Sequence, residues 1–155
     1  MIYWFTGQPE HGKTTLAKRL IVDLEKEYGA LNVFHIDGDD LRALFTNVDY
    51  SINGRVQNVN TAQRLAHYLH NQGKQVVVSL ISPYIDQREE FKSVIGNYLV
   101  EFYIHSSVPK MRDKNKALAY IQPKDKYCDI DTTTDSVEQS YDLIKQYIHH
   151  RKTMV

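Results

Sequence analysis

Eight consecutive residues near the start of the chain have the types and spacing of a phosphate-binding loop. They read Gly7-Gln8-Pro9-Glu10-His11-Gly12-Lys13-Thr14, and Thr15 follows them. Glycine at both ends lets backbone N–H groups turn toward bound phosphates, because a Cβ there would block the approach. A lysine at this place reaches the β- and γ-phosphates, and the next hydroxyl ligates magnesium. The loop therefore predicts binding of a nucleoside triphosphate with Mg²⁺.

A second group of candidate residues is the acidic stretch Asp37-Gly38-Asp39-Asp40-Leu41-Arg42, which follows a predicted strand. Phosphoryl transfer needs positioning, charge neutralisation and an acceptor for the proton of the attacking hydroxyl. Asp37 is a candidate metal ligand beside Thr14, and Asp39 is a candidate to hold that proton or to steer magnesium. The alternative is that these aspartates only cap the next helix, since Asp is favoured at helix N-termini.

Two further segments could contact an anionic acceptor. In Gly54-Arg55-Val56-Gln57-Asn58, an arginine fork and a side-chain amide stand at the start of a predicted helix, although an arginine there is often only a solvated surface residue. The stretch Ser79-Leu80-Ile81-Ser82-Pro83-Tyr84 leaves a predicted strand, and Pro83 ends the strand pairing. The hydroxyls of Ser82 and Tyr84 are expected at the functional edge of the sheet, with a plain connecting loop as the alternative.

One class of nucleotide-binding protein is disfavoured. Signalling GTPases read guanine through an aspartate that this chain lacks: Asn115-Lys116-Ala117-Leu118 begins like that motif but has no aspartate where guanine would be recognised. The strand ending at Ser79 also has no terminal aspartate to act as a second metal motif.

The elements that must position these residues alternate between short apolar runs and longer amphipathic stretches. Residues Leu16, Leu20 and Leu24 after the loop recur at helical spacing. The expected strands are Ile2–Thr6, Asn32–Ile36, Gln75–Ser79, Leu99–Ile104 and Tyr127–Ile130. This alternation predicts an α/β three-layer sandwich, with helices on both faces of a central parallel five-stranded sheet. Ligands of such sheets bind beyond the carboxyl ends of the strands, where the loop lies.

Two helix ends are also predicted from local signals. Gly73 is a plausible C-cap of the helix that contains Val59 and Leu69. The last helix is expected to open with a capping box in which Asp135 pairs with Glu138.

Composition sets broad limits. The 155 residues allow one domain, 1–155, with a single core. Lys and Arg balance Asp and Glu at 19 each, so no global field attracts nucleic acid or an anionic membrane. Only Cys128 is present and no apolar run is long enough to span a bilayer, so a cytoplasmic protein is expected.

Taken together, the loop, the acidic stretch, Arg55 with Asn58, and Ile81-Ser82-Pro83-Tyr84 resemble adenylylsulfate kinases in order and spacing. The resemblance covers about the first two thirds of the chain well. It implies a P-loop fold of the nucleoside and nucleotide kinase type. It also implies transfer of the γ-phosphoryl group of ATP to the 3′-hydroxyl of adenosine 5′-phosphosulfate, with Mg²⁺ as cofactor. Members of that family are often dimers, which makes a homodimer one expectation.

The resemblance also implies roles for single residues. Lys13 and Asp39 match catalytic positions. The acceptor nucleotide would be held by a set that includes Asp37 and Asp39 together with Arg42, Arg55, Asn58, Ile81 and Ser82. The adenine of ATP would lie near Arg112, Asp131 and Thr132.

This chain departs from the family pattern on the acceptor side. The family has a glutamate where Gln57 stands, and two arginines where Asn60 and Thr61 stand. Its lid is longer than the stretch between Arg112 and Pro123, in which Lys114 or Lys116 would replace the lid lysine and Tyr120 the stacking aromatic. Two alternatives follow: a kinase of the same fold with a different small anionic nucleotide or metabolite as acceptor, or a nucleotide-binding module without catalytic activity.

Overall fold

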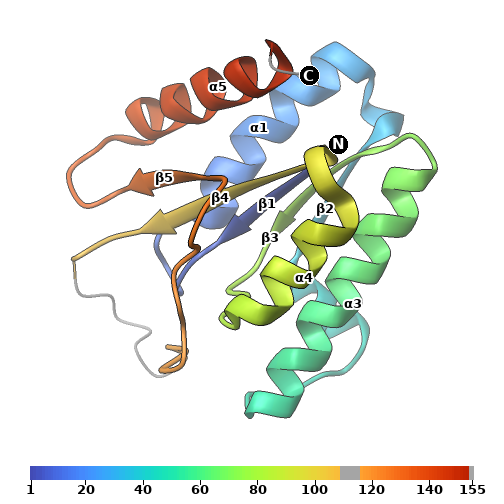
Figure 1. Cartoon of the computed structure of the whole chain (residues 1–155), viewed down its shortest axis with the longest axis vertical. Coiled ribbons are helices and arrows are strands. Elements are labelled where there is room, and N and C mark those ends of the chain that lie inside the picture. The colour runs from blue at the N-terminus through green and yellow to red at the C-terminus, as the bar shows by residue number, and fades with distance from the viewer. Residues whose placement is uncertain (109–115, 154–155) are drawn as a thin grey trace.

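The central sheet has five parallel strands. The computed structural model describes residues 1–108 and 116–153 (Figure 1). Its strands are β1 (Ile2–Thr6), β2 (Val33–Asp37), β3 (Gln75–Ser79), β4 (Leu99–His105) and β5 (Tyr127–Asp131). They lie in the order β2-β3-β1-β4-β5, and every neighbouring pair is parallel. The predicted strands are thus confirmed, with β2 shifted one residue toward the C-terminus.

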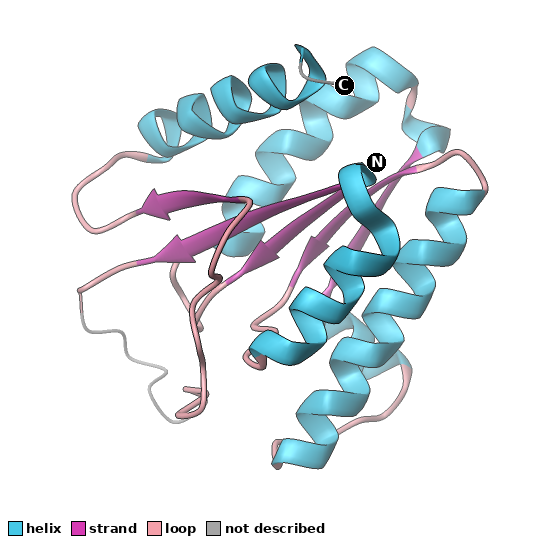
Figure 2. Cartoon of the chain, in the orientation of Figure 1, coloured by secondary structure: helices cyan, strands magenta, loops and turns pink. Residues whose placement is uncertain are grey.

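Helices cover both faces of this sheet (Figure 2). The α-helices are α1 (Lys13–Tyr28), α2 (Gly38–Leu44), α3 (Ile52–Asn71), α4 (Ile85–Ile95) and α5 (Val137–Thr153). Short 3₁₀ turns, η1 (Ala30–Asn32) and η2 (Gly96–Tyr98), precede β2 and β4. One apolar core joins the sheet to α1 and α5, and the other joins it to α2, α3 and α4. The three-layer α/β sandwich is therefore confirmed.

The sequence of β1 shows why both faces need cover. Successive side chains of a strand point to opposite faces. Tyr3 and Phe5 pack in the core with α1, while Ile2 and Trp4 pack in the core with α3 and α4. All four are fully or almost fully buried. An unbroken apolar run is what a central parallel strand requires.

Two helix-end predictions have different outcomes. Gly73 has φ 77° and donates its N–H to the carbonyl of His70 (2.9 Å), so it terminates α3 as expected, one residue after the C-cap Gln72. The capping box of α5 is one residue away from the prediction. Ser136 Oγ accepts the N–H of Gln139 (3.2 Å), and Gln139 Oε1 accepts the N–H of Ser136 (2.8 Å). The Asp135–Glu138 pairing was wrong, because α5 begins at Val137 and the cap therefore falls on Ser136.

In the parts of the chain that the structure describes, no helix is both long enough and apolar enough to cross a membrane.

Candidate active site

The predicted phosphate loop connects β1 to α1 and has the backbone that its glycines allow. Gly7 has φ 148°, and a Cβ built there would lie 2.0 Å from the carbonyl oxygen of Ile104. Gly12 has φ 99° and directly precedes α1. The loop therefore packs closely against the end of β4 and delivers the N-terminus of α1 to its concave side, where an anion is favoured.

Lys13 is held inside this loop. Its ammonium donates a hydrogen bond to the carbonyl of Gln8 (2.6 Å), and the residue is 8% exposed. Burial lowers the pKa of Lys13 to about 8, against the opposing effect of the carboxylates of Asp37 and Asp39. A desolvated ammonium of this kind gains strongly from a phosphate, because a close anion restores the stabilisation that water no longer provides.

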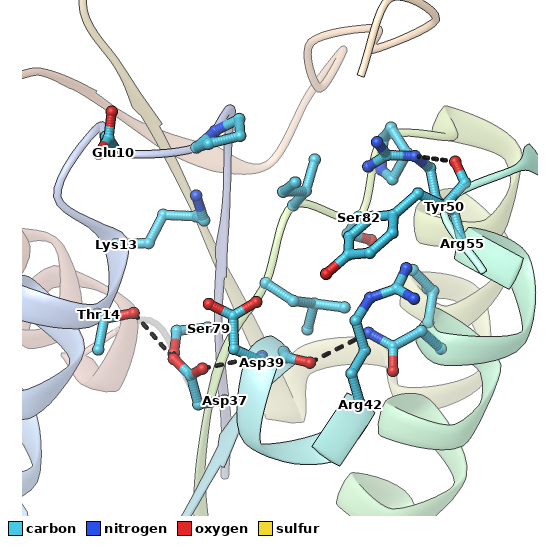
Figure 3. Close-up of a pocket in the computed structure, with 17 residues that line it drawn as sticks. Glu10, Lys13, Thr14, Asp37, Asp39, Arg42, Tyr50, Arg55, Ser79 and Ser82 are labelled. Atoms are coloured by element: carbon cyan, nitrogen blue, oxygen red, sulfur yellow. Dashed lines mark hydrogen bonds between the residues drawn. The ribbon is translucent and has the colours of Figure 1, made fainter. Parts of the chain in front are cut away.

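Asp37 joins the loop to the strands beside it (Figure 3). One of its oxygens, Oδ2, accepts hydrogen bonds from Thr14 Oγ1 and Ser79 Oγ, both at 2.8 Å. The other oxygen caps α2 by accepting the N–H of Asp39 (3.0 Å). Burial raises the pKa of Asp37, but these hydrogen bonds outweigh burial and leave the pKa below its ordinary value. Asp37 is thus an ionised carboxylate that accepts the Thr14 hydroxyl, and capping α2 would not prevent it from binding a metal ion.

A histidine that the sequence did not single out completes this group. His35 Nε2 lies 2.8 Å from Ser79 Oγ. Because Ser79 has one hydroxyl hydrogen and donates it to Asp37, His35 donates from Nε2 to the serine. Burial lowers the pKa of His35. The strand register, with Asp37 opposite Ser79, brings the three side chains together.

Magnesium fits the oxygen atoms at this place. Mg²⁺ prefers hard oxygen ligands and is commonly held by one or two carboxylates together with substrate phosphates. Thr14 and Asp37 supply a hydroxyl and a carboxylate in direct contact. Among residues 1–108 and 116–153 there is no cluster of three or more His, Cys, Asp or Glu side chains that would hold a metal alone. The ion would therefore be shared with the phosphates of a bound nucleotide.

The predicted acceptor residues face the same cavity. Arg42 donates from Nη1 to the carbonyl of Asp49 (2.8 Å), and its guanidinium lies 4.3 Å from the ring centre of Tyr50. Arg55 donates from Nε to the carbonyl of Tyr50 (3.0 Å). Asn58 is buried and donates to the carbonyl of Gly38 (3.4 Å). Two cations thus surround an aromatic ring that the sequence reasoning missed.

The exit of β3 forms the opposite wall. The Ile81 carbonyl accepts the hydroxyl of Thr6 (2.7 Å). Ser82 has φ 46°, and its hydroxyl is buried without a protein partner among the described residues. Ser82 itself lines the cavity. Tyr84 lies at the start of α4 and does not line the cavity.

These groups enclose a single cavity of about 270 Å³. Asp39 lines it beside Lys13 and Asp37, whereas its neighbour Asp40 does not (Figure 3). The other predicted residues in its wall are Pro9, Glu10, Thr14, Arg42, Arg55, Asn58, Ile81 and Ser82. The cavity therefore joins the phosphate loop, the carboxylates and the arginines in one space.

Of the residues predicted to lie near adenine, the two that the structure describes, Asp131 and Thr132, are outside this cavity. Thr132 Oγ1 lies within hydrogen-bond distance of the carbonyls of His11 and His105, both at 3.0 Å, so it contacts the phosphate loop from the end of β5. Asp131 accepts the N–H of Thr133 (2.8 Å) within its own turn. Arg112 lies outside the described residues.

The candidate lid residues also lie away from the cavity, as far as the structure describes them. Tyr120 stacks on Tyr103 with ring centres 5.8 Å apart, and its hydroxyl lies 3.0 Å from Thr6 Oγ1. Lys116 is exposed, and Lys114 lies outside the described residues. Among the described residues, Tyr50 and not Tyr120 is the aromatic side chain that lines the cavity.

Comparison with known proteins adds the following. A family model described as adenylylsulphate kinase matches residues 1–143. A cytidine diphosphoramidate kinase from Campylobacter jejuni is 28% identical over 128 aligned positions, which span 83% of this chain and 74% of that protein. An adenylyl-sulfate kinase from Staphylococcus epidermidis is 26% identical over 167 aligned positions, spanning 95% of this chain and 83% of that protein.

Among solved structures, the APS kinase of Mycobacterium tuberculosis in complex with AMPPNP and APS is similar in fold. It superposes with a TM-score of 0.76 at 22% sequence identity, and the match covers 96% of each chain. At that identity the likeness speaks for the fold alone.

Proposed function

This chain belongs to the adenylylsulfate kinase family, a family of ATP-dependent kinases, and we propose that it phosphorylates the 3′-hydroxyl of adenosine 5′-phosphosulfate with ATP and Mg²⁺. The observation that carries the proposal is the single cavity in which the phosphate loop and Asp39 face Arg42 and Arg55. A donor site alone would not need cations on the wall beyond the carboxylates. We place the reaction in the reducing cytoplasm, in keeping with a lone, buried Cys128.

The donor half of the site holds the triphosphate. Backbone N–H groups of Gly7–Thr15, except at Pro9, which has none, would bond the phosphate oxygens, with the N-terminus of α1 behind them. Lys13 would leave the Gln8 carbonyl and bond the β- and γ-phosphates. Thr14 and Asp37 would hold Mg²⁺, which when bound neutralises part of the charge on these phosphates.

The acceptor half holds the nucleophile. Arg42 and Arg55 would bond the anionic 5′ group of the acceptor, Asn58 and Ser82 its polar edges, and the Tyr50 ring offers an apolar face for its base. Asp39 would accept the proton of the attacking hydroxyl. The hydroxyl oxygen bonds to the γ-phosphorus, the bond from that phosphorus to the β–γ bridging oxygen breaks, and ADP leaves.

A second candidate is the same transfer to a cytidine nucleotide with a substituted 5′-diphosphate. The similarity to the Campylobacter jejuni kinase favours it. So does the acceptor side of α3, where the family arginines are replaced by Asn60 and Thr61. Asn60 Oδ1 accepts from Gln87 Nε2 (2.9 Å), and neither residue lines the cavity. At these two positions of α3 the chain has no positive charge, unlike a family member with both arginines.

Transfer of labelled phosphate from ATP distinguishes these readings. The purified protein is incubated with Mg²⁺ and, separately, with adenosine 5′-phosphosulfate, a cytidine diphosphate conjugate and the unsubstituted nucleotides. We expect a labelled 3′-phosphorylated product from adenosine 5′-phosphosulfate, and none with the Lys13→Ala protein. Selective transfer to the cytidine conjugate would replace the first acceptor with the second. ATP binding without transfer to any acceptor would contradict both and favour a binding module.

A further inference from the structure

Arg88 is a buried cation outside the cavity. It lies on α4 and is 3% exposed. Its guanidinium is used on every side: Nε is 3.1 Å from Glu101 Oε1, Nη1 donates to the carbonyl of Ser82, and Nη2 donates to the carbonyl of Ile121. The Tyr120 ring centre is 5.2 Å from the guanidinium carbon. Two hydrogen bonds to carbonyls and one ion pair with a carboxylate give the guanidinium a defined orientation.

The charge of Arg88 is balanced by a carboxylate on β4. Glu101 is 1% exposed, and its second oxygen lies 2.7 Å from Lys92 Nζ. Lys92 in turn is 2.8 Å from Glu89 Oε1. Replacing a buried ion pair by apolar residues is often neutral or stabilising, so the pair is weak evidence for a role in stability. The role of Arg88 instead follows from the groups that accept its hydrogen bonds.

One group that Arg88 holds is the exit of β3, residues Ile81–Pro83, here called the acceptor wall. Ser82 lines the cavity and has φ 46°, a left-handed backbone that is strained in a residue other than glycine. The hydrogen bond from Arg88 fixes its carbonyl, and the bond from Thr6 fixes the carbonyl of Ile81 just before it. Two consecutive carbonyls at the exit of β3 are therefore tied to neighbouring elements.

The other group is the segment Ala117–Ile121, here called the return segment. It reaches the acceptor wall through the N–H of Ile121, which donates to the carbonyl of Pro83 (3.1 Å). It reaches the phosphate loop through Ala117, whose N–H donates to Gln8 Oε1 (3.0 Å) and whose carbonyl accepts from Gln8 Nε2 (2.9 Å). Arg88 thus bonds both the acceptor wall and the return segment, which connects that wall to the phosphate loop.

We propose that Arg88 is a positioning residue for phosphoryl transfer: it holds Ser82 and the return segment so that the acceptor wall keeps its place relative to the phosphate loop. This inference rests on the proposed function. It differs from a stability role because it requires a loss in acceptor use without a matching loss in ATP binding. A misplacement of about 1 Å can cost up to about a hundredfold in rate.

Two variants test the inference. Arg88→Lys keeps a cation beside Glu101 but carries its donors on one nitrogen, whereas the guanidinium reaches the two carbonyls and the carboxylate from three separate nitrogens. A single Arg88→Met change would leave the buried carboxylate of Glu101 without this partner. The double variant Arg88→Met with Glu101→Gln removes both charges of the pair, so that the protein can still fold. Arg151→Lys is the matched control: this arginine on α5 also bonds two carbonyls, those of Asn97 (3.3 Å) and Leu99 (3.2 Å), at the opposite edge of the sheet.

Amide hydrogen exchange is measured first, because it does not depend on the acceptor. We expect faster exchange in peptides covering 79–85 and 116–123 in both Arg88 variants, and unchanged exchange there in the Arg151→Lys protein. With the acceptor that the wild-type protein uses, kcat/KM should fall about tenfold or more while the affinity for AMPPNP stays within about twofold.

Two results would overturn the inference. One is unchanged exchange in both stretches, and the other is a loss of AMPPNP affinity as large as the loss of acceptor use, which is what a general structural defect would cause. If the wild-type protein phosphorylates no acceptor, the proposed function fails. The exchange data still decide in that case whether Arg88 holds the two stretches.

Discussion

At the scale of single residues, the donor site places a lysine whose charged form is destabilised by burial beside an aspartate whose charged form is stabilised by hydrogen bonds. Burial lowers the pKa of Lys13 to about 8, whereas the hydrogen bonds to Asp37 outweigh burial and keep its pKa below the ordinary value. The carboxylate is thus ready for a metal ion at neutral pH. The ammonium begins to lose its charge just above neutral pH unless an anion binds.

We therefore expect nucleotide affinity to fall as pH rises above about 8. Bound phosphates raise the pKa of Lys13 above its value in the free protein, so binding takes up a proton once free Lys13 is neutral. Below pH 8 this contribution is flat. Above it, affinity should fall by up to about tenfold per pH unit. Titration with AMPPNP between about pH 7 and pH 9 measures the slope. The Lys13→Arg protein should show no such slope, because arginine stays charged over this pH range. A wild-type affinity that does not change with pH would contradict the contact between Lys13 and the phosphates.

Adjacent aspartates provide a second test at this scale. Asp39→Asn should lower kcat about a hundredfold or more, because the variant cannot accept the proton of the attacking hydroxyl. Asp40→Asn is the control, since Asp40 is exposed on the same helix and does not line the cavity. Steady-state kinetics with the identified acceptor compare the two proteins. Equal activity of both variants would remove Asp39 from the catalytic step.

At the scale of elements, the turn between α2 and α3 sets the acceptor arginines. Asn47 accepts from Arg42 Nη1 at its side-chain oxygen (3.1 Å) and donates to the carbonyl of Gly54 (3.0 Å). A Cβ on Gly54 would lie 2.1 Å from the carbonyl oxygen of Asp49. The first turn of α3 and the preceding turn are therefore packed backbone to backbone.

Gly54→Ala should move this turn. Backbone atoms cannot yield as a flexible side chain does, so we expect a loss of about 1 to 3 kcal/mol in the free energy of unfolding. The displaced turn takes Arg42 with it and should raise KM for the acceptor more than it changes AMPPNP affinity. Denaturant unfolding and steady-state kinetics measure the two effects. Gly96→Ala is the comparison for strain alone, because its Cβ would meet no atom within 4 Å although its φ is 62°.

The cap of α5 gives an element-scale test of stability alone. Ser136→Ala removes the hydroxyl that accepts the N–H of Gln139 and should cost about 1 kcal/mol in the free energy of unfolding. Asp135→Ala should cost much less, because Asp135 lies outside the capping box. Urea unfolding of both variants decides between them. A larger cost at Asp135 would restore the pairing first expected from the sequence.

At the scale of the whole molecule, the site is assembled from segments that are distant in the chain. The loop after β1, the start of α2, the first turns of α3 and the exit of β3 meet at one edge of the sheet (Figure 1). They meet there because the strands are parallel and every carboxyl end faces the same way. A ligand that bonds all of them stabilises the folded state as a whole.

Nucleotide and metal should therefore raise the unfolding temperature together. AMPPNP with Mg²⁺ at about a hundred times its Kd should add about 2.7 kcal/mol to the free energy of unfolding. Chelation of Mg²⁺ should reduce the gain, and Lys13→Ala should abolish most of it. Thermal unfolding with and without EDTA measures both effects. An equal shift in the chelated sample would argue against a metal at Thr14 and Asp37.

The strands, the phosphate loop and the acidic stretch after β2 could be predicted from the chain alone. Each is a local pattern: Ile2–Phe5 is an unbroken apolar run, and Gly7–Thr14 has a fixed spacing that only its own backbone must satisfy. The helix cap of α5 was missed by one residue because Asp135-Ser136 offers two capping side chains, and only the packed helix selects Ser136. Local sequence patterns are thus sufficient to predict secondary-structure elements and motifs.

Contacts between side chains that are distant in the chain could not be predicted in this way. His35 reaches Asp37 through Ser79, and Arg88 holds Ser82 together with a carbonyl that follows β4. Such partners come from different strands and helices, and no spacing along the chain records them. Charge type and burial become informative only once the sheet order brings the segments together. The phosphate loop and most residues of the acceptor side could therefore be predicted from the chain, whereas Tyr50 and the contacts of Arg88 could not.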